Sequence, residues 1–200
     1  MTQTRATATE TAMQAGQQRW LGQYYLARAG FSLLWIAAIL TVGRQIPVLG
    51  AALLVLYPAW DAAANYADAA RHGGLRQNRS QAFNVLFSAG TALAVLVALP
   101  VSPAAVLGVF SAWAIVAGLL QLAAAVGRWS TAGAQWAMVL SGGQSALAGG
   151  FFAVQALQGA PALAPALAGY AGFGAIYFLV SAVLLFVRKG PGSASAAADR

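Results

Sequence analysis

The sequence contains no cysteine and has only four acidic residues among its 200 positions. Without cysteine, the chain cannot form disulfide bonds, thiolate nucleophiles or cysteine-ligated metal sites. Charged residues make up 8% of the chain, whereas soluble domains carry about 25%. Hydrophobic residues make up 60%, and the mean hydropathy is +0.69. The chain lacks the polar surface of a water-soluble globule, so its composition predicts an integral membrane protein.

Groups that could perform catalysis are also scarce. His72 is the single histidine, and it has no evident serine partner. Asp61 and Asp68 are two helical turns apart, about 10 Å along a helix axis, which is too far for two carboxylates to share a proton. The phosphate-binding patterns GxGxxG and GxxxxGK(S/T) do not occur in the sequence. We therefore expect no enzymatic activity, no cofactor and no metal ion.

The net charge of +7 is the one compositional feature that could point to nucleic acid. Nucleic-acid binding needs a clustered basic face, however, and the arginines here are spread between apolar runs. A role in setting membrane topology explains the positions of the arginines better than nucleic-acid binding does. We therefore expect the lipid bilayer as partner and no nucleic acid. Association with a second copy of the chain or with another membrane protein is left open.

Six apolar segments follow a polar N-terminal stretch, and each approaches the roughly 20 residues that a membrane-spanning helix needs. We predict an all-α protein with a polar cytoplasmic tail over residues 1–22, a six-helix transmembrane domain over 23–189 and a flexible cytoplasmic tail over 190–200. The first tail could end in a short interfacial helix. Pro58 lies inside the second segment and predicts a bend there. The segments are 25–43, 47–70, 82–99, 104–127, 132–155 and 166–187.

The positive charges are distributed unevenly between the links. Arg44 is the only cation in the first, third and fifth links. Because arginine and lysine favour the cytoplasmic side of a membrane, this bias predicts that both termini are cytoplasmic. The cations assigned to that side are Arg5, Arg19, Arg28, Arg71, Arg76, Arg79, Arg128, Arg188, Lys189 and Arg200.

The even-numbered segments share a layout, in which a proline near the start is followed by a glycine and the end is marked by an arginine. The glycines Gly50, Gly108 and Gly169 recur at intervals of about 60 residues. This regularity predicts a helical hairpin repeated three times, with the short turn outside the cell. The alternative is coincidence, because glycine and arginine are common near the ends of any membrane helix.

Small residues follow helical spacing on the fifth segment. In lipid, such residues let helix backbones approach closely and gain dispersion contacts. We expect them to pack helices within one bundle. One stripe consists of Gly142, Ala146 and Gly150, and a second beside it consists of Ser141, Ser145 and Gly149.

Three stretches carry a family resemblance: LGVFSAWAIVAGLLQLAAAVGR at 107–128, LSGGQSALAGGFFAV at 140–154 and AGYAGFGAIYFLVSAVLLFVRK at 168–189. They resemble the HdeD-like family of small bacterial inner-membrane proteins, which are built from short repeated helix pairs. The resemblance covers about residues 25–189. It implies six helices in the cytoplasmic membrane and a role in acid or general stress resistance, and it brings no catalytic residues. The stretch at 57–78 is similar to one branch of the family, and its acids depart from the usual apolar pattern.

The second segment carries the clearest polar pattern in the chain. Its polar side chains lie four, four, three and four residues apart, which aligns them along one face of a helix. Counting from the first turn, Arg28 and Asp61 differ by only a few Å in depth at about 1.5 Å per residue, so we predict an ion pair between them. The same count around the next link places Asn65 near Asn84. The stripe consists of Tyr57, Asp61, Asn65, Asp68 and His72.

This polar network has three interpretations. It could hold helices in register, Asp61 could exchange a proton or bind an ion, or Asp68 and His72 could begin a metal site that would need further ligands. Separately, the sequence leaves three functions open: a non-enzymatic HdeD-like membrane protein, a small transporter or ion conduit centred on Asp61, and a subunit or assembly factor of a membrane complex. The remaining intramembrane amides are expected to bond between helices or, alternatively, to line a pore, and they are Gln121, Gln144 and Gln155.

Overall fold

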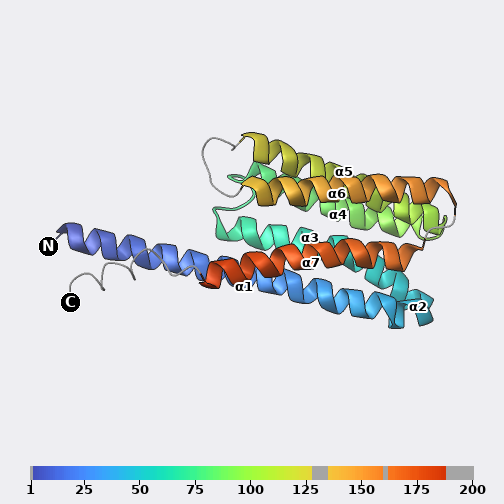
Figure 1. Cartoon of the computed structure of the whole chain (residues 1–200), viewed down its shortest axis with the longest axis horizontal. Coiled ribbons are helices and arrows are strands. Elements are labelled where there is room, and N and C mark those ends of the chain that lie inside the picture. Colours follow the sequence, from blue (N-terminus) through green and yellow to red (C-terminus); the bar gives the residue numbers. More distant parts are fainter. Residues whose placement is uncertain (1, 128–134, 160–161, 188–200) are drawn as a thin grey trace. The chain divides into compact units, whose positions relative to one another are not determined.

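The computed structural model describes residues 2–127, 135–159 and 162–187, and all regular secondary structure in these ranges is α-helical. The all-α prediction is therefore confirmed. The second, third, fourth and sixth predicted segments coincide with helices to within a few residues, and so does the described part of the fifth. The first, 25–43, overlaps the end of a much longer helix and the short helix that follows it. Figure 1 shows the helices in chain order. The helices are α1 (Thr2–Leu40), α2 (Val42–Gln45), α3 (Pro47–Arg71), α4 (Arg79–Ala98), α5 (Pro103–Gly127), α6 (Gln135–Leu157) and α7 (Leu163–Val187).

Five helical stretches are long and apolar enough to cross a membrane, which indicates a multi-pass membrane protein. α6 has 23 residues and is not among these five. The five stretches are Ala15–Gln45, Pro47–Arg71, Arg79–Ala98, Pro103–Ala123 and Leu163–Val187.

The N-terminal stretch is helical, and its assignment as a polar cytoplasmic tail stays a prediction. α1 runs from Thr2 to Leu40, so residues 2–22 belong to the same helix as the first apolar segment. The helix in this stretch is therefore longer than the short interfacial helix considered from the sequence. Alanine, glutamine and arginine in this stretch have high helix propensity, and no proline interrupts it. The predicted C-terminal tail, residues 190–200, lies outside the described residues.

Proline and glycine set the boundaries of α3. Ile46 has an extended backbone with φ −120° and ψ 99°, as is usual before a proline, and α3 starts at Pro47. After the helix ends at Arg71, Gly73 and Gly74 have φ values of 91° and 84°. This left-handed conformation favours glycine, and it lets the Gly74 N–H donate to the Ala69 carbonyl at 2.8 Å. The link that follows α3 is therefore a defined turn.

Pro58 lies inside α3 and is almost fully buried. It has no N–H for the carbonyl one turn earlier, so the hydrogen-bond ladder of the helix is interrupted at that point. Close to this interruption, the Trp35 indole of α1 donates a hydrogen bond of 2.7 Å to the Leu53 carbonyl. α3 continues through the proline, and the bend expected there stays a prediction.

The chain divides into two compact units, and α1 and α7 each contribute to both. One unit comprises residues up to Leu33 together with those from Gly172 onward, and the other comprises Leu34–Ala171. Within the second unit, α5 packs most extensively against α6, α3 packs against α4, and a smaller contact joins α4 to α5 (Figure 1). These helices carry most of the polar residues singled out from the sequence.

The α5–α6 interface brings the two backbones into direct contact. A Cβ added at Gly118 of α5 would lie 2.5 Å from the Gly142 carbonyl oxygen and 2.5 Å from the Ala146 nitrogen. One turn further, a Cβ at Gly149 would lie 2.8 Å from the Ser111 carbonyl oxygen. Gly142 and Ala146 thus pack as expected, but Gly149 takes the third position, because Gly150 has no atom within 4 Å of an added Cβ.

The glycines of the predicted repeat have different surroundings. A Cβ added at Gly50 would lie 2.4 Å from the Gly43 carbonyl oxygen, so glycine is required where α3 meets the preceding turn. Gly108 and Gly169 have no atom within 4 Å of an added Cβ. Their positions in the sequence correspond, but their packing does not, and the threefold repeat stays a prediction.

Candidate functional site

A hydrogen-bonded junction centred on Asp61 joins α3, α4 and α5. The Ser88 hydroxyl of α4 donates to Asp61 Oδ2 at 2.8 Å, and the Asn65 amide donates to the same oxygen at 2.9 Å. Asn65 also donates to the Asp61 backbone carbonyl at 2.8 Å. The Trp113 indole of α5 donates to Ser88 Oγ at 3.2 Å. Ser88, Asn65 and Trp113 are buried, so the junction replaces water as the hydrogen-bonding environment of the carboxylate.

Aromatic side chains surround this junction. The Tyr57 ring lies 4.5 Å from the Trp35 ring and 6.0 Å, edge to face, from the Trp113 ring. Trp113 also contacts Phe110 on its own helix and Tyr170 of α7, both edge to face. Such contacts contribute roughly 0.5–1.5 kcal/mol each beyond area burial, and here they fix the Trp113 ring that anchors Ser88.

A second polar contact lies beside the first, between α6 and α7. The Ser145 hydroxyl and the Tyr170 hydroxyl are 2.7 Å apart, and Tyr170 also packs edge to face against Phe152. Ser145 belongs to the second small-residue stripe, where only a packing role was expected. Its hydroxyl therefore adds a hydrogen bond to that packing.

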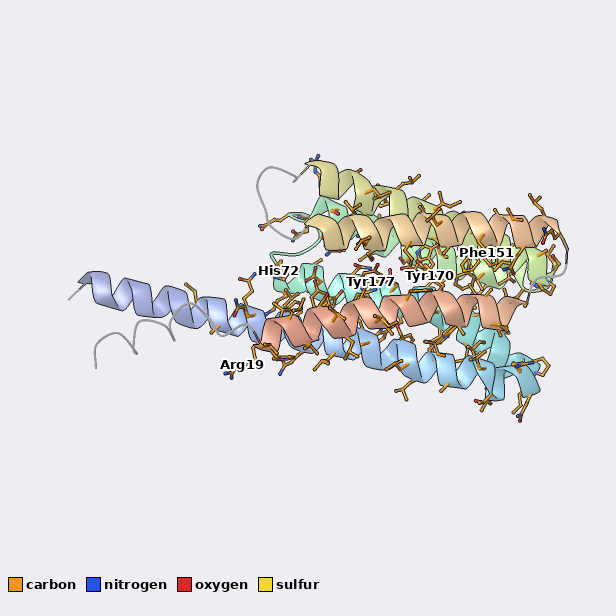
Figure 2. The ribbon with its side chains drawn as sticks, in the orientation of Figure 1. Arg19, His72, Phe151, Tyr170 and Tyr177 are labelled. Atoms are coloured by element: carbon orange, nitrogen blue, oxygen red, sulfur yellow. The ribbon has the colours of Figure 1, made fainter. Side chains whose placement is uncertain are left out.

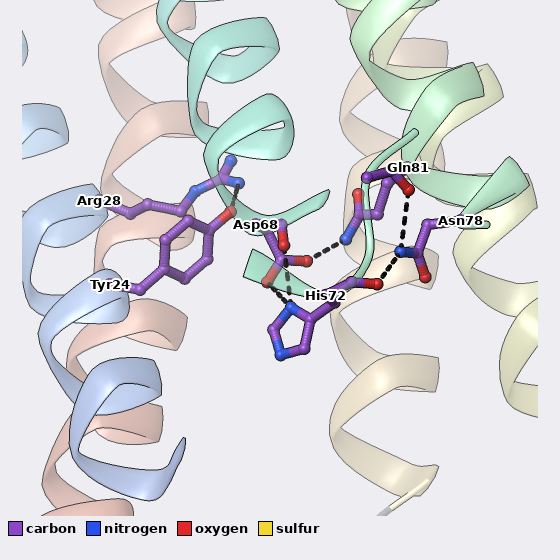
Figure 3. Close-up of polar contacts among 7 residues, drawn as sticks. Tyr24, Arg28, Asp68, His72, Asn78 and Gln81 are labelled. Carbon is purple, nitrogen blue, oxygen red and sulfur yellow. Dashed lines mark hydrogen bonds and ion pairs between the residues drawn. The ribbon is translucent and has the colours of Figure 1, made fainter. Parts of the chain in front are cut away.

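The C-terminal end of α3 carries another cluster, shown in Figure 3. His72 Nδ1 lies 3.1 Å from Asp68 Oδ1 and 2.8 Å from the Asp68 carbonyl oxygen. The Gln81 amide of α4 donates to Asp68 Oδ2, while Gln81 Oε1 is buried without a hydrogen-bond partner among the described residues. Asn78 donates to the His72 carbonyl at 2.5 Å. The cluster ties the end of α3 to the start of α4.

Arg28 lies in the other unit, on α1. Its guanidinium donates to the Tyr24 hydroxyl at 3.0 Å, as Figure 3 also shows, and it lies 4.4 Å from the centroid of the Phe178 ring. Tyr25 stacks on the same ring at 6.0 Å. These cation–π and hydrogen-bond contacts surround the partly buried arginine with favourable neighbours. The predicted Arg28–Asp61 ion pair would join the two units, and it stays a prediction.

The predicted stripe on α3 therefore resolves into separate groups. Tyr57 belongs to the aromatic cluster, Asp61 and Asn65 form the junction, and Asp68 and His72 belong to the end of the helix. Asn65 bonds to Asp61 one turn earlier, and it makes no hydrogen bond to Asn84 within the described ranges.

Sequence reasoning missed Ser88, Trp113, Gln81 and the Ser145–Tyr170 contact. A serine or a tryptophan in an apolar helix has no distinctive spacing, so only the depth count around the link could have found Ser88 and Gln81. No cluster of three or more histidine, aspartate or glutamate residues that could hold a metal occurs among the side chains that the structure describes. The described contacts at the junction include two side-chain hydrogen bonds to one carboxylate oxygen.

No protein-family model, no curated protein and no solved structure matches this chain.

Proposed function

We propose that this chain is a non-enzymatic integral protein of the bacterial cytoplasmic membrane, in which the Asp61 junction has a structural role. The observation that carries the proposal is the pair of donors, Ser88 and Asn65, that converge on Asp61 Oδ2 at 2.8 and 2.9 Å. A carboxylate that carries protons must exchange its partners during each cycle. One held by donors from two helices, with Trp113 behind Ser88, is suited to keeping helices in register.

The proposed architecture has six spans with both termini in the cytoplasm, and α6 is the span added to the five candidate stretches. The 23 residues of α6 are sufficient in length for a span, and the helix packs closely along α5. Gly, Ser and Gln are common where membrane helices pack against one another, and Gly142, Ser145 and Gly149 lie on the packed sides of α6. The charge bias of the links supports the orientation. The HdeD-like resemblance extends the proposal to a role in acid or general stress resistance.

The experiment compares the wild-type protein with Asp61→Asn in liposomes and in detergent. Asparagine keeps the shape and an acceptor oxygen but cannot carry a proton. We expect equal proton flux from both proteins, no higher than that of empty liposomes, and a lower midpoint of thermal unfolding for Asp61→Asn. Proton flux in the wild type that disappears in Asp61→Asn would reject the structural role and favour a conduit.

The physiological part of the proposal needs a separate measurement. Deletion of the gene in its native host is expected to reduce survival after an acid shock, and expression of the wild-type chain should restore it. Unchanged survival under acid and other stresses would contradict the stress role while leaving the role of the junction intact. Recovery in mild detergent with stoichiometric amounts of another membrane protein would favour an assembly factor instead.

A further inference from the structure

α6 contacts other helices on two sides and is exposed on a third. Gly142 and Gly149 meet α5, and the Ser145 and Phe152 side chains meet Tyr170 of α7. The third side, named here the outer face of α6, carries large apolar side chains with high exposure. They are Leu140 (59%), Leu147 (77%), Phe151 (60%) and Val154 (51%), and Figure 2 labels Phe151.

Two glycines make this outer face open to close approach. A Cβ added at Gly143 or Gly150 would have no atom within 4 Å, in contrast to the tightly packed Gly142 and Gly149. Gly143 and Gly150 are seven residues apart and flank Leu147, so they lie on the same side of the helix. An open glycine face is compatible with lipid alone, so it does not by itself identify an occupant.

The Gln144 amide identifies the kind of occupant. Gln144 flanks the outer face, is partly exposed, and makes no hydrogen bond with any described residue. Gln155, three turns later, projects from nearly the same side and also makes none. In the proposed six-span architecture Gln144 lies near the middle of the bilayer, where an amide facing acyl chains loses its hydrogen bonds to water. The favourable neighbour is therefore a helix that offers both a donor and an acceptor at the same depth.

We propose that the outer face of α6 binds a second copy of this chain, with Gln144 bonded to Gln144 of the second copy. The amide carries a positive N–H edge and a negative carbonyl oxygen, so two such groups are complementary in charge. Copies inserted in the same orientation place this residue at equal depth, and a two-fold axis along the membrane normal brings the two together. Gly143 and Gly150 allow the helices to approach. The inference depends on the proposed insertion of α6 in the membrane.

The absence of cysteine makes a direct test straightforward. Single cysteines are introduced as Leu147→Cys on the outer face and, as a matched control, as Leu86→Cys on α4, which is exposed to 73%. Membranes containing each variant are oxidised with copper phenanthroline and analysed for disulfide-linked dimers. We expect several-fold more dimer for Leu147→Cys than for Leu86→Cys. Equal and low amounts of dimer for both variants would overturn the proposal.

A second variant tests the role of the amide. Gln144→Leu in the Leu147→Cys background is expected to weaken dimerisation about 3- to 20-fold, the range typical of one intramembrane hydrogen bond. Because Gln144 bonds to no described residue, thermal unfolding of Gln144→Leu in detergent should be close to that of the wild type. Dimer formation that Gln144→Leu leaves unchanged would overturn the amide pairing.

The same variants separate this inference from the proposed architecture. Labelling of Leu147→Cys by a membrane-impermeant maleimide would show that α6 is not embedded, which contradicts the six-span proposal and the dimer together. An unlabelled Leu147→Cys that forms no dimer contradicts the dimer alone. Cross-linking to a different membrane protein, without a homodimer, also contradicts it.

Discussion

The Ser88 hydroxyl donates a hydrogen bond of 2.8 Å to Asp61 Oδ2 and accepts one of 3.2 Å from the Trp113 indole. One small side chain thus connects three helices, because Asp61 lies on α3, Ser88 on α4 and Trp113 on α5. Removal of the hydroxyl leaves the indole N–H without its acceptor and the carboxylate with one donor fewer.

We therefore expect Ser88→Ala to lower the free energy of unfolding by about 1–3 kcal/mol, the usual cost of leaving buried polar groups unsatisfied. Thermal unfolding in detergent, followed by tryptophan fluorescence, measures the effect. Ser80→Ala is the matched control, because Ser80 lies on the same helix and is exposed. Equal unfolding midpoints for the two variants would show that the junction contributes little to stability.

The contact between α5 and α6 leads to a second prediction. Gly118→Ala would place its Cβ 2.5 Å from backbone atoms of α6, so the helices have to separate. Overpacking of this kind costs about 1–3 kcal/mol. Gly108→Ala on the same helix, where no atom lies within 4 Å, is expected to leave stability nearly unchanged. Thermal or SDS-induced unfolding that ranks the two variants the other way would contradict this packing.

The predicted Arg28–Asp61 pair can be tested by a double-mutant cycle. Arg28→Gln and Asp61→Asn each remove one charge, and the loss of one member of an intramembrane pair leaves the other uncompensated. We expect the double variant to be more stable than the sum of the single effects predicts, with a coupling of about 1–3 kcal/mol. Additive changes in unfolding free energy would show that each charge is compensated by other groups, such as Tyr24 for Arg28.

The orientation can be tested with single cysteines in the links. Gln77→Cys lies between α3 and α4, and Gln158→Cys follows α6, and both positions are exposed. If both termini are cytoplasmic, an impermeant maleimide added to spheroplasts labels Gln158→Cys, and it labels Gln77→Cys only after the membrane is permeabilised. The opposite labelling pattern would place the Arg71–Arg79 segment outside the cell and reverse the topology.

The positions of the helices could be predicted from the sequence because long apolar runs, prolines and glycines act locally. Pro47 and Pro103 begin helices as expected, and Gly73 and Gly74 follow the end of α3. The N-terminal extension of α1 could not be predicted from apolar content, because a polar alanine-rich stretch folds as a helix through backbone propensity alone.

For the junction, the sequence could predict which residues of α3 and α4 lie at the same depth, but not which of them form hydrogen bonds. The predicted Asn65–Asn84 pair is centred on the Gly74–Leu75 step, and so are the observed Asp61–Ser88 and Asp68–Gln81 contacts. The depth count therefore agrees with these two contacts, and the proximity of Asn65 to Asn84 stays a prediction. Which side chains bond depends on rotation of each helix about its axis, and the Asn65 amide reaches back along α3 to Asp61.

The length of α1 has a mechanical consequence. Its 39 residues extend for about 58 Å, whereas the hydrocarbon layer is about 30 Å thick. When the apolar part of α1 spans the hydrocarbon layer, roughly half of the helix therefore lies outside that layer. Arg19, which is exposed and is labelled in Figure 2, belongs to the polar half. A tag or reporter joined to the first residue would therefore be attached to the end of a continuous helix rather than to a flexible linker.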